Sequence, residues 1–346
     1  MTSGKNATFD TAIAIRPQER PPSRMLVAMR VDVLVLNHVF DLGLSAVLDA
    51  FHTANELIDL SGMAVRRFDV RVVGVRATVT SAQGLRVPVR EAGSKTPEVV
   101  VVPAIGYKMP ETLEPALSRP DIRDAAAVLR RWAARGATVS AACIGTFVMA
   151  ESGVLDGRRA TTTWWLAPLF RQRYPNVVLE DSHMVVKSGR VVTAGAALGH
   201  MDLALWLIRA ASPKLAELTA RYLIVDSRPS QSAYALTDHL THTDPLVQRF
   251  EDWARSHLAR RFSLDAAAKA VAASKRTLAR RMHTVLGKTP VAYVQDLRVE
   301  RALQLLTTGG ATVDEAAARV GYADGATLRT LLRRKLHAGV KEIRRL

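Results

Sequence analysis

The chain has 346 residues, 48% of them hydrophobic, and a formal net charge of +16. This length is enough for two domains, each with a core of its own. The single cysteine excludes an internal disulfide framework, and no apolar run approaches the ~20 residues that a membrane span needs. We therefore expect a cytoplasmic protein with no membrane contact.

The first segment, residues 1–23, is polar and contains Pro17, Pro21 and Pro22. It has no long apolar core, which a signal peptide would need. We predict a disordered leader.

Residues 24–212 show the pattern of an α/β domain with a doubly wound parallel sheet, because β-rich runs alternate with helical stretches. The runs Val99–Val102 and Ala137–Ala142 are apolar or small throughout, as expected for strands covered on both faces. The other predicted strands are Met25–Leu36, Phe68–Val75, Val177–Val178, Met184–Val186 and Val191–Thr193, and the predicted helices include Ser45–Leu60, Asp121–Arg135 and Met201–Ala211.

Within this domain, Ser140–Phe147 predicts a strand that turns sharply into a helix. Cys143 stands at the turn, and the small residues Ala141 and Gly145 permit it. This arrangement is similar to a nucleophile elbow, in which the helix N-terminus lowers the pKa of a thiol. The alternative is a buried cysteine that only fills space, the usual role of a cysteine in an apolar run.

Residues 213–244 are expected to begin as a helix and to become a linker. The Asp244-Pro245 step then starts a new helix that runs through Trp253. The last region, residues 245–346, is predicted to be all-α. It contains 20 Lys and Arg against 9 Asp and Glu and so holds +11 of the net charge.

This all-α region repeats one pattern, at 262–282 and at 312–335: a helix, a tight turn and a second helix. Ser263 and Thr312 can cap the first helices, and Ser274 and Asp324 can cap the second ones. The second helices are basic, as major-groove recognition helices need to be. Two tandem helix-turn-helix units favour nucleic acid over a solvated basic face or a membrane patch.

Between the two copies, Pro290–Leu306 predicts one stiff helix. Its length is roughly 25 Å at about 1.5 Å per residue, enough to hold two recognition helices about one DNA turn, about 34 Å, apart. Arg298, Glu300 and Arg301 are expected on its polar, solvated face.

This region resembles the AraC/XylS family of bacterial transcription regulators, in stretches that include Ser274–Arg281, Gly287–Pro290 and Gly321–Asp324. The resemblance implies double-stranded DNA as partner, with RNA polymerase as a second candidate. By position, the base-facing residues would be Arg276, Ala279 and Arg280 in the first copy and Gly325, Ala326, Arg329 and Thr330 in the second. Lys275, Arg281 and Arg333 complete the predicted DNA-binding set. Direct readout is expected from Arg276, Arg280 and Arg329, because alanine can touch only a thymine methyl group.

The chain departs from the family pattern near its end, at Leu332, His337, Gly339-Val340 and Ile343, and in the first turn, where Ala272-Ala273 replaces Gly-Met. We therefore expect the second copy to bind DNA less tightly than the first.

The preceding domain, from about residue 24 to 228, resembles the DJ-1/PfpI class of the glutamine-amidotransferase-like superfamily, in the form found in GlxA-type AraC regulators. The matching stretches are Val99–Gly106, Gly136–Trp164, Arg173–Pro175 and Val192–Gly195. This resemblance implies a domain that senses a small molecule or mediates dimerisation.

Catalysis by this domain is not expected. In hydrolytic and glyoxalase-like relatives a His follows the Cys, whereas Ile144 follows Cys143 here, and Thr163 stands where GlxA-type relatives often have a His. Asp41 is the sole acid of the first-strand loop. A general base must come within about 3 Å of the group it activates. The remaining histidines, His38, His52, His183 and His200, are expected to be structural or at the surface.

Ligands of open α/β sheets bind beyond the carboxyl ends of the strands. We therefore predict a small-molecule effector site at that edge, although side chains could fill it instead. Asp41 hints at a cationic or hydroxylated ligand. The predicted site residues are Asn37, Asp41, Gly106, Cys143, Ile144, Thr163, Trp164 and Thr193.

The sequence thus predicts a homodimeric, non-enzymatic transcription regulator with no cofactor and no metal. Activation is one expected mode, but activation and repression use the same DNA-binding unit, so the sign stays open. The alternatives are a thiol enzyme of the DJ-1/PfpI superfamily tethered to DNA, and a constitutive architectural DNA-binding protein.

Overall fold

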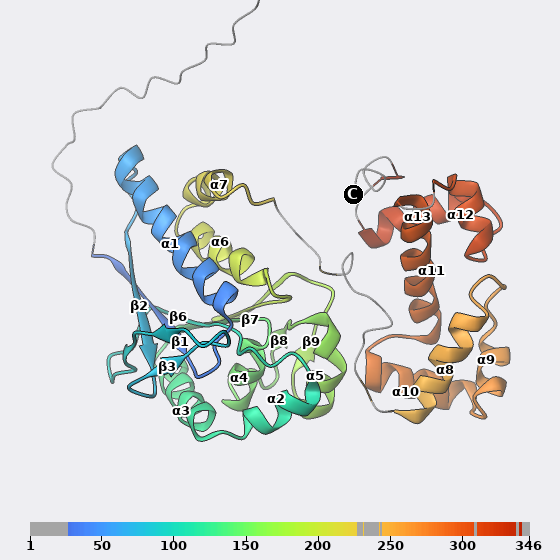
Figure 1. Ribbon diagram of the computed structural model, residues 1–346, viewed down its shortest axis with the longest axis horizontal. Coiled ribbons are helices and arrows are strands. Elements are labelled where there is room, and N and C mark those ends of the chain that lie inside the picture. Colours follow the sequence, from blue (N-terminus) through green and yellow to red (C-terminus); the bar gives the residue numbers. More distant parts are fainter. Residues whose placement is uncertain are drawn as a thin grey trace, which may run out of the picture.

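The computed structural model describes residues 27–226, 231, 242, 244–307, 310–336 and 339–340. The expected leader, residues 1–23, lies outside this part of the chain. An α/β domain comes first and a helical domain follows it (Figure 1).

The α/β domain is built on a seven-stranded sheet with the order β10-β11-β7-β6-β1-β2-β5. Its strands pair in parallel, except that β10 is antiparallel to β11. The bounds are β1 Met29–Val35, β2 Phe68–Gly74, β5 Arg90–Glu91, β6 Val99–Val102, β7 Thr138–Ala142, β10 Val185–Ser188 and β11 Val191–Ala194. Two small ribbons join β3 (Val79–Thr80) to β4 (Arg86–Val87) and β8 (Arg159–Ala160) to β9 (Val178–Leu179).

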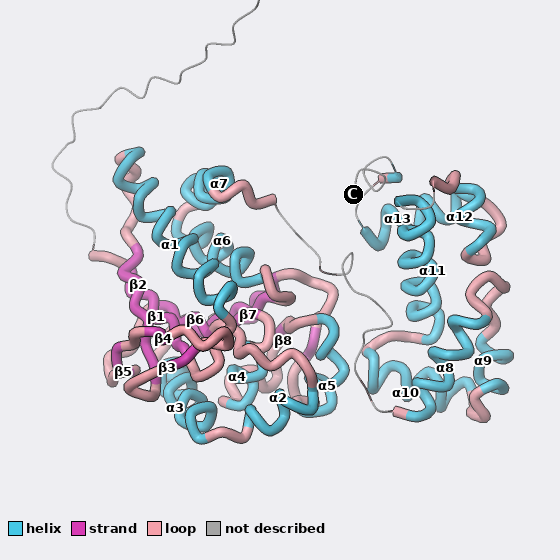
Figure 2. The backbone as a smooth tube through the Cα atoms, viewed as in Figure 1, coloured by secondary structure: helices cyan, strands magenta, loops and turns pink. Residues whose placement is uncertain are grey.

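Helices cover both faces of this sheet, which Figure 2 shows as a magenta layer between cyan helices. One face carries α1 (Asp41–Ser61), α6 (Gly199–Ala211) and α7 (Pro213–Tyr222). The other carries α2 (Pro110–Leu117), α3 (Pro120–Ala134), α4 (Gly145–Glu151) and α5 (Ala167–Arg173).

Strand β6 shows why the sheet is buried on both sides. Val99 and Val101 belong to the core under α1 and α6, whereas Val100 and Val102 belong to the core under α3 and α4. A strand has a side-chain period of two, so a run of four valines supplies both cores. The predicted doubly wound fold is confirmed, with one antiparallel edge strand.

The segment expected to be a linker begins with α7. Its Leu215 and Ala216 are buried in the core shared with α1 and α6. Ser212 caps this helix by accepting from the N–H of Leu215 at 3.2 Å. The α/β fold therefore continues through α7 before the connection to the helical domain starts.

The helical domain has two cores. The first is formed by α8 (Pro245–Ser256), α9 (Leu264–Ala270) and α10 (Lys275–Leu286), and the second by α12 (Val313–Arg319) and α13 (Gly325–Leu336). The predicted connecting helix is present as α11 (Pro290–Thr307) and contributes to both cores. We call α9–α10 the first unit and α12–α13 the second unit.

The expectation for Arg298 was wrong, because this side chain is buried and not solvated on α11. Its guanidinium donates to the carbonyl oxygens of Leu258 at 3.2 Å and Arg260 at 2.5 Å. It also lies over the ring of Tyr322, with 4.8 Å between Cζ and the ring centroid. A Cβ on Gly321 would come within 2.7 Å of the guanidinium. Arg298 therefore joins the segment after α8 to the turn of the second unit.

Replacing Arg298 by Ala is expected to lower the free energy of unfolding of the helical domain by about 3 kcal/mol, because two charge-assisted hydrogen bonds to part-buried backbone carbonyls are lost. Denaturant titration followed by tryptophan fluorescence measures this. The control is Arg301→Ala on the same helix, whose exposed side chain should cost less than about 0.5 kcal/mol. Equal losses in the two variants would contradict the bridging role.

Candidate functional site

The first unit is capped as predicted. Ser263 accepts from the N–H of Ala266 at 3.3 Å, and Ser274 accepts from the N–H of Thr277 at 3.0 Å. The apolar side of α10 is buried in the core with α8 and α9. Its cationic side is therefore turned to solvent.

The second unit begins with a capping box. The Thr312 hydroxyl accepts from the N–H of Glu315 at 3.2 Å, and the Glu315 carboxylate accepts from the N–H of Thr312 at 2.8 Å. Asp324 caps α13 by accepting from the N–H of Thr327 at 2.7 Å. These hydrogen bonds hold the pKa values of Glu315 and Asp324 below their usual range.

Eight of the nine predicted DNA-binding side chains are exposed, and Ala279 is half-buried. The exposed residues are Lys275, Arg276, Arg280, Arg281, Ala326, Arg329, Thr330 and Arg333. Gly325 differs, because it is buried and its N–H donates to the Asp314 carboxylate at 3.0 Å. It cannot face a base as the resemblance implied.

The cations of α10 differ in their partners. Lys275 pairs with Asp265 at 2.8 Å, and Arg281 pairs with Asp244, the N-cap of α8. Within the described residues, neither Arg276 nor Arg280 forms an ion pair. These two guanidiniums are therefore available to an external anion, whereas Arg281 also holds α8 against α10.

The turns of the two units have the same backbone form with different residues. Ala272 has φ 55° and Gly321 has φ 80°. A left-handed conformation costs a non-glycine residue about 1–2 kcal/mol, while glycine adopts it freely. The replacement noted in the first turn thus leaves local strain at Ala272.

The predicted elbow is confirmed. Cys143 has φ 55°, and its N–H donates to the carbonyl of Ala194 on the neighbouring strand at 2.8 Å. Only a glycine fits at position 145, the first residue of α4. A Cβ on Gly145 would lie 2.3 Å from the carbonyl oxygen of Val102. The strained turn is therefore packed directly against the end of β6.

The thiol at this elbow is only 3% exposed. Burial raises the pKa of Cys143 to about 12, and the hydrogen bond from the Ile144 N–H opposes this shift without offsetting it. The side chain is thus a neutral thiol at physiological pH. Burial thus disfavours the thiolate form that a cysteine nucleophile needs.

This burial predicts a pH dependence. The unfolded thiol ionises near 9.0 and the folded thiol near 12, so the free energy of unfolding should fall as pH rises between these values. Comparison with Cys143→Ala by denaturant titration isolates the effect. In the native protein a disulfide reagent should react with Cys143 much more slowly than in the denatured chain. Fast native reaction would contradict a buried neutral thiol.

Three of the four histidines considered as bases, His52, His183 and His200, have other partners. His200 is buried, accepts from the N–H of Ala104 at 3.0 Å through Nε2, and bonds the carbonyl of Ala197 at 2.7 Å. Burial lowers the pKa of His200 to about 4, so it is neutral. His52 and His183 have exposed side chains beside glutamates. The expectation of structural or surface histidines is confirmed for these three.

The predicted effector-site residues form two groups. Around the elbow, Cys143, Ile144, Thr163 and Thr193 are buried, and Trp164 is half-buried. In the second group, Asn37 accepts from the N–H of Thr80 and Asp41 from that of Gln83, each at 3.1 Å, and Gly106 donates to the His38 carbonyl at 2.6 Å. The polar atoms of the second group thus hold loops together.

A cavity of about 640 Å³ lies elsewhere, between α6, α7 and β10, and is lined by residues that include Trp206, Arg209 and Glu217. Among the described residues, no cluster of three potential metal ligands occurs. Nor is any described helix both long enough and apolar enough to cross a bilayer.

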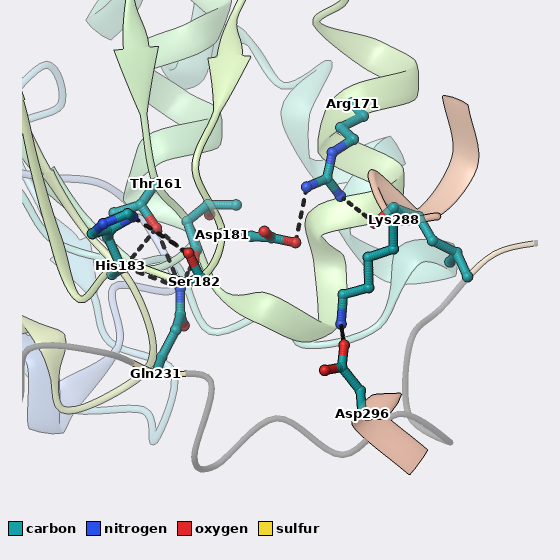
Figure 3. A network of polar contacts seen from close by, with 10 residues as sticks. Thr161, Arg171, Asp181, Ser182, His183, Gln231, Lys288 and Asp296 are labelled. Carbon is teal, nitrogen blue, oxygen red and sulfur yellow. Dashed lines mark hydrogen bonds and ion pairs between the residues drawn. The ribbon is translucent and has the colours of Figure 1, made fainter. Parts of the chain in front are cut away.

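Sequence reasoning missed two residues, one at the contact between the domains and one in the segment that connects them. Arg171 of α5 donates to the carbonyl of Leu286, at the end of α10, at 3.2 Å and pairs with Asp181 at 2.9 Å (Figure 3). A Cβ on Gly287 would lie 2.4 Å from the Arg171 guanidinium. The α/β domain therefore caps the C-terminus of the first unit's recognition helix. A cation in this place is also favoured by the helix dipole.

The second missed residue is Gln231, from the expected linker. It is fully buried, and its N–H donates to the carbonyl of Ser182 at 3.1 Å. No signal in the sequence singles out one glutamine in such a segment, because its role depends on where the chain returns to the sheet.

Comparisons with known proteins agree with both domains. A model of the DJ-1/PfpI family matches residues 29–210, and a helix-turn-helix domain model matches residues 267–346. The chain is 29% identical over 199 residues to the HTH-type transcriptional regulator CdhR of Pseudomonas aeruginosa, covering 56% of this chain and 59% of CdhR. It is 24% identical over 316 residues to the regulator GbdR of the same species, covering 90% and 81%.

Among solved structures, an AraC family transcriptional regulator from Pseudomonas putida is 23% identical with a TM-score of 0.47, covering 56% of this chain and 99% of that one. Drosophila melanogaster DJ-1beta is 18% identical with a TM-score of 0.46, covering 58% and 100%.

The chain has an α/β domain with a cysteine elbow, followed by paired helix-turn-helix units. These features place it in the class of two-domain transcription regulators. The chain belongs to the DJ-1/PfpI family, and its C-terminal region is of the AraC helix-turn-helix type.

Proposed function

We propose that this regulator binds DNA sequence-specifically through α10 and α13 and responds to a small molecule bound by its α/β domain. The observation that supports the DNA interface is the pair of exposed guanidiniums of Arg276 and Arg280, which form no ion pair with a described residue. They lie on α10, a capped helix whose opposite side is buried. Arg can bond guanine bidentately in the major groove. The 18-residue helix α11, roughly 27 Å long at about 1.5 Å per residue, spaces the two units.

Selection of bound genomic fragments by the purified full-length chain tests this interface. A motif of two half-elements about one helical turn apart is expected, because each unit reads one major groove. The double variant Arg276→Ala/Arg280→Ala should lose the enrichment. Binding that is salt-sensitive but indifferent to sequence in the unsubstituted chain would count against specific readout.

The two units are expected to contribute unequally. Arg276→Ala should weaken binding to the selected site about tenfold or more. Arg329→Ala should cost less, because its guanidinium lies 3.9 Å from the Asp314 carboxylate and the second unit departs from the family pattern. Fluorescence anisotropy with a labelled duplex measures both. Arg319→Ala, an exposed cation on α12, is the control. Equal losses for Arg276 and Arg329 would refute the asymmetry.

The α/β domain acts as a sensor and not as an enzyme in this proposal. The neutral, buried thiol of Cys143 and the structural place of His200 support a non-catalytic elbow. The rival function, a thiol enzyme tethered to DNA, would need a reactive thiolate. Metabolite screening by thermal shift, repeated with Cys143→Trp and Trp164→Ala, tests whether the elbow lies at the effector site; stabilisation unchanged by both variants would exclude it.

We also propose a homodimer, because two tandem units gain affinity by pairing and α/β domains of this kind commonly self-associate. Of the residues considered for the interface, Phe51 and Ile58 are buried in the core, whereas Leu42 is 50% exposed. Light scattering should give twice the mass of one chain at micromolar concentration. A strict monomer would refute the dimer, and Leu42→Glu tests its place.

We propose a cytoplasmic location, because a transcription regulator must be in the same compartment as the DNA it binds. RNA polymerase is a candidate partner. A constitutive architectural protein would instead show DNA affinity that no ligand changes.

A further inference from the structure

The buried glutamine of the interdomain connection occupies a recess of the α/β domain. Gln231 is 0% exposed, and its side chain enters between the segment after β8 and the loop that carries Ser182 and His183 (Figure 3). Its floor is the backbone of Gly195. A Cβ there would lie 2.3 Å from the Nε2 atom of Gln231, so only glycine leaves the recess open.

Three oxygen atoms of this recess surround the glutamine nitrogen. Nε2 lies 2.9 Å from the carbonyl oxygen of Thr162, 3.2 Å from the hydroxyl oxygen of Thr161 and 3.4 Å from the carbonyl oxygen of His183. A carboxamide has two N–H donors, whereas a primary ammonium has three. The recess thus presents three acceptor atoms to two carboxamide donors, and one of the three, the His183 carbonyl oxygen, also accepts from the Thr161 hydroxyl at 3.0 Å.

The other half of the carboxamide fits poorly. The Oε1 atom of Gln231 is buried and accepts no hydrogen bond from a described residue. An unmet buried acceptor is costly. A group that carries only donors would avoid this cost, and a positively charged one would form shorter and stronger bonds to the carbonyl oxygens.

We propose that the recess formed by Thr161, Thr162, His183 and Gly195 is a binding site for the primary ammonium group of a small ligand, and that Gln231 occupies it in the ligand-free chain. This inference rests on the proposed function, since it names the chemistry of the sensed molecule. It also gives the effector a place adjacent to Thr193, whose hydroxyl accepts from the N–H of Thr161 at 2.8 Å.

Occupation of the recess is coupled to the DNA-binding domain through one loop. Ser182 and His183 contact Gln231, and the preceding Asp181 pairs with Arg171, which caps α10 at Leu286 (Figure 3). A ligand that displaces Gln231 removes the contacts of this side chain and its backbone N–H with Ser182 and His183. The effector thereby changes the contacts that orient the first unit.

The test is chemical rescue of a vacated recess in the full-length chain. Thermal unfolding of Gln231→Ala is measured with ethylammonium chloride, propionamide, tetramethylammonium chloride and potassium chloride at equal concentration. Ethylammonium should raise the Tm by about 2–4 °C and more than the other three. The wild-type chain should need about tenfold more ethylammonium for the same shift, because tethered Gln231 competes at a high effective concentration.

A second substitution checks the acceptors. Thr161→Val in the Gln231→Ala background keeps the shape and removes one oxygen, so the ethylammonium response should disappear. Thr219→Val is the matched control, because this buried hydroxyl donates to the Leu215 carbonyl within α7, away from the recess. It should leave the response unchanged.

Two results would overturn the proposal. An equal or larger rise in Tm with propionamide than with ethylammonium would mean that the recess selects a carboxamide. No rise in Tm with any probe, in Gln231→Ala or in the wild type, would mean that the recess only docks Gln231. Neither measurement uses DNA. Failure of the ammonium site is thus separate from failure of the proposed function, which fragment selection decides.

Discussion

The guanidinium of Arg298 is the contact on which the geometry of the helical domain depends. The two units have separate cores, and α11 alone runs through both. Helix α11 fixes the separation of the two units, but by itself it leaves each unit free to rotate about its contacts with the helix. Arg298 removes that freedom by bonding two carbonyls before the first unit and stacking on Tyr322 in the second. Lysine lacks both the planar fork and the stacking surface, so it is no substitute.

In the α/β domain, the backbone of the elbow is held in a strained conformation by its neighbours. Its elbow keeps the strained backbone of Cys143, a conformation that costs about 1–3 kcal/mol and persists only where its surroundings hold it. The surroundings here are the carbonyl of Ala194, which accepts from the Cys143 N–H, and the close packing of Gly145 against the end of β6. The turn therefore places small residues and backbone oxygens at the carboxyl edge of the sheet.

Local patterns in the sequence predict most of the fold. Four consecutive valines in β6 indicate a strand buried on both faces, and Ser274 and Thr312 mark helix starts because capping depends on neighbours along the chain. Arg298 and Gln231 could not be found this way, since an arginine on a helix is expected to face solvent and periodicity assigns a linker glutamine to no element. Their partners lie about 40 to 70 residues away in the sequence, at positions that only the folded chain brings together.

The cap that Arg171 places on α10 also bears on exchange of domains between regulators. Leu286 takes its donor from the α/β domain, and Gly287 is the residue whose missing side chain admits the guanidinium. A chimera that joins this helical domain to a foreign sensor would leave the carbonyl at the end of its recognition helix without that donor. A hybrid that carries the α5 surface along with the helical domain would keep this hydrogen bond.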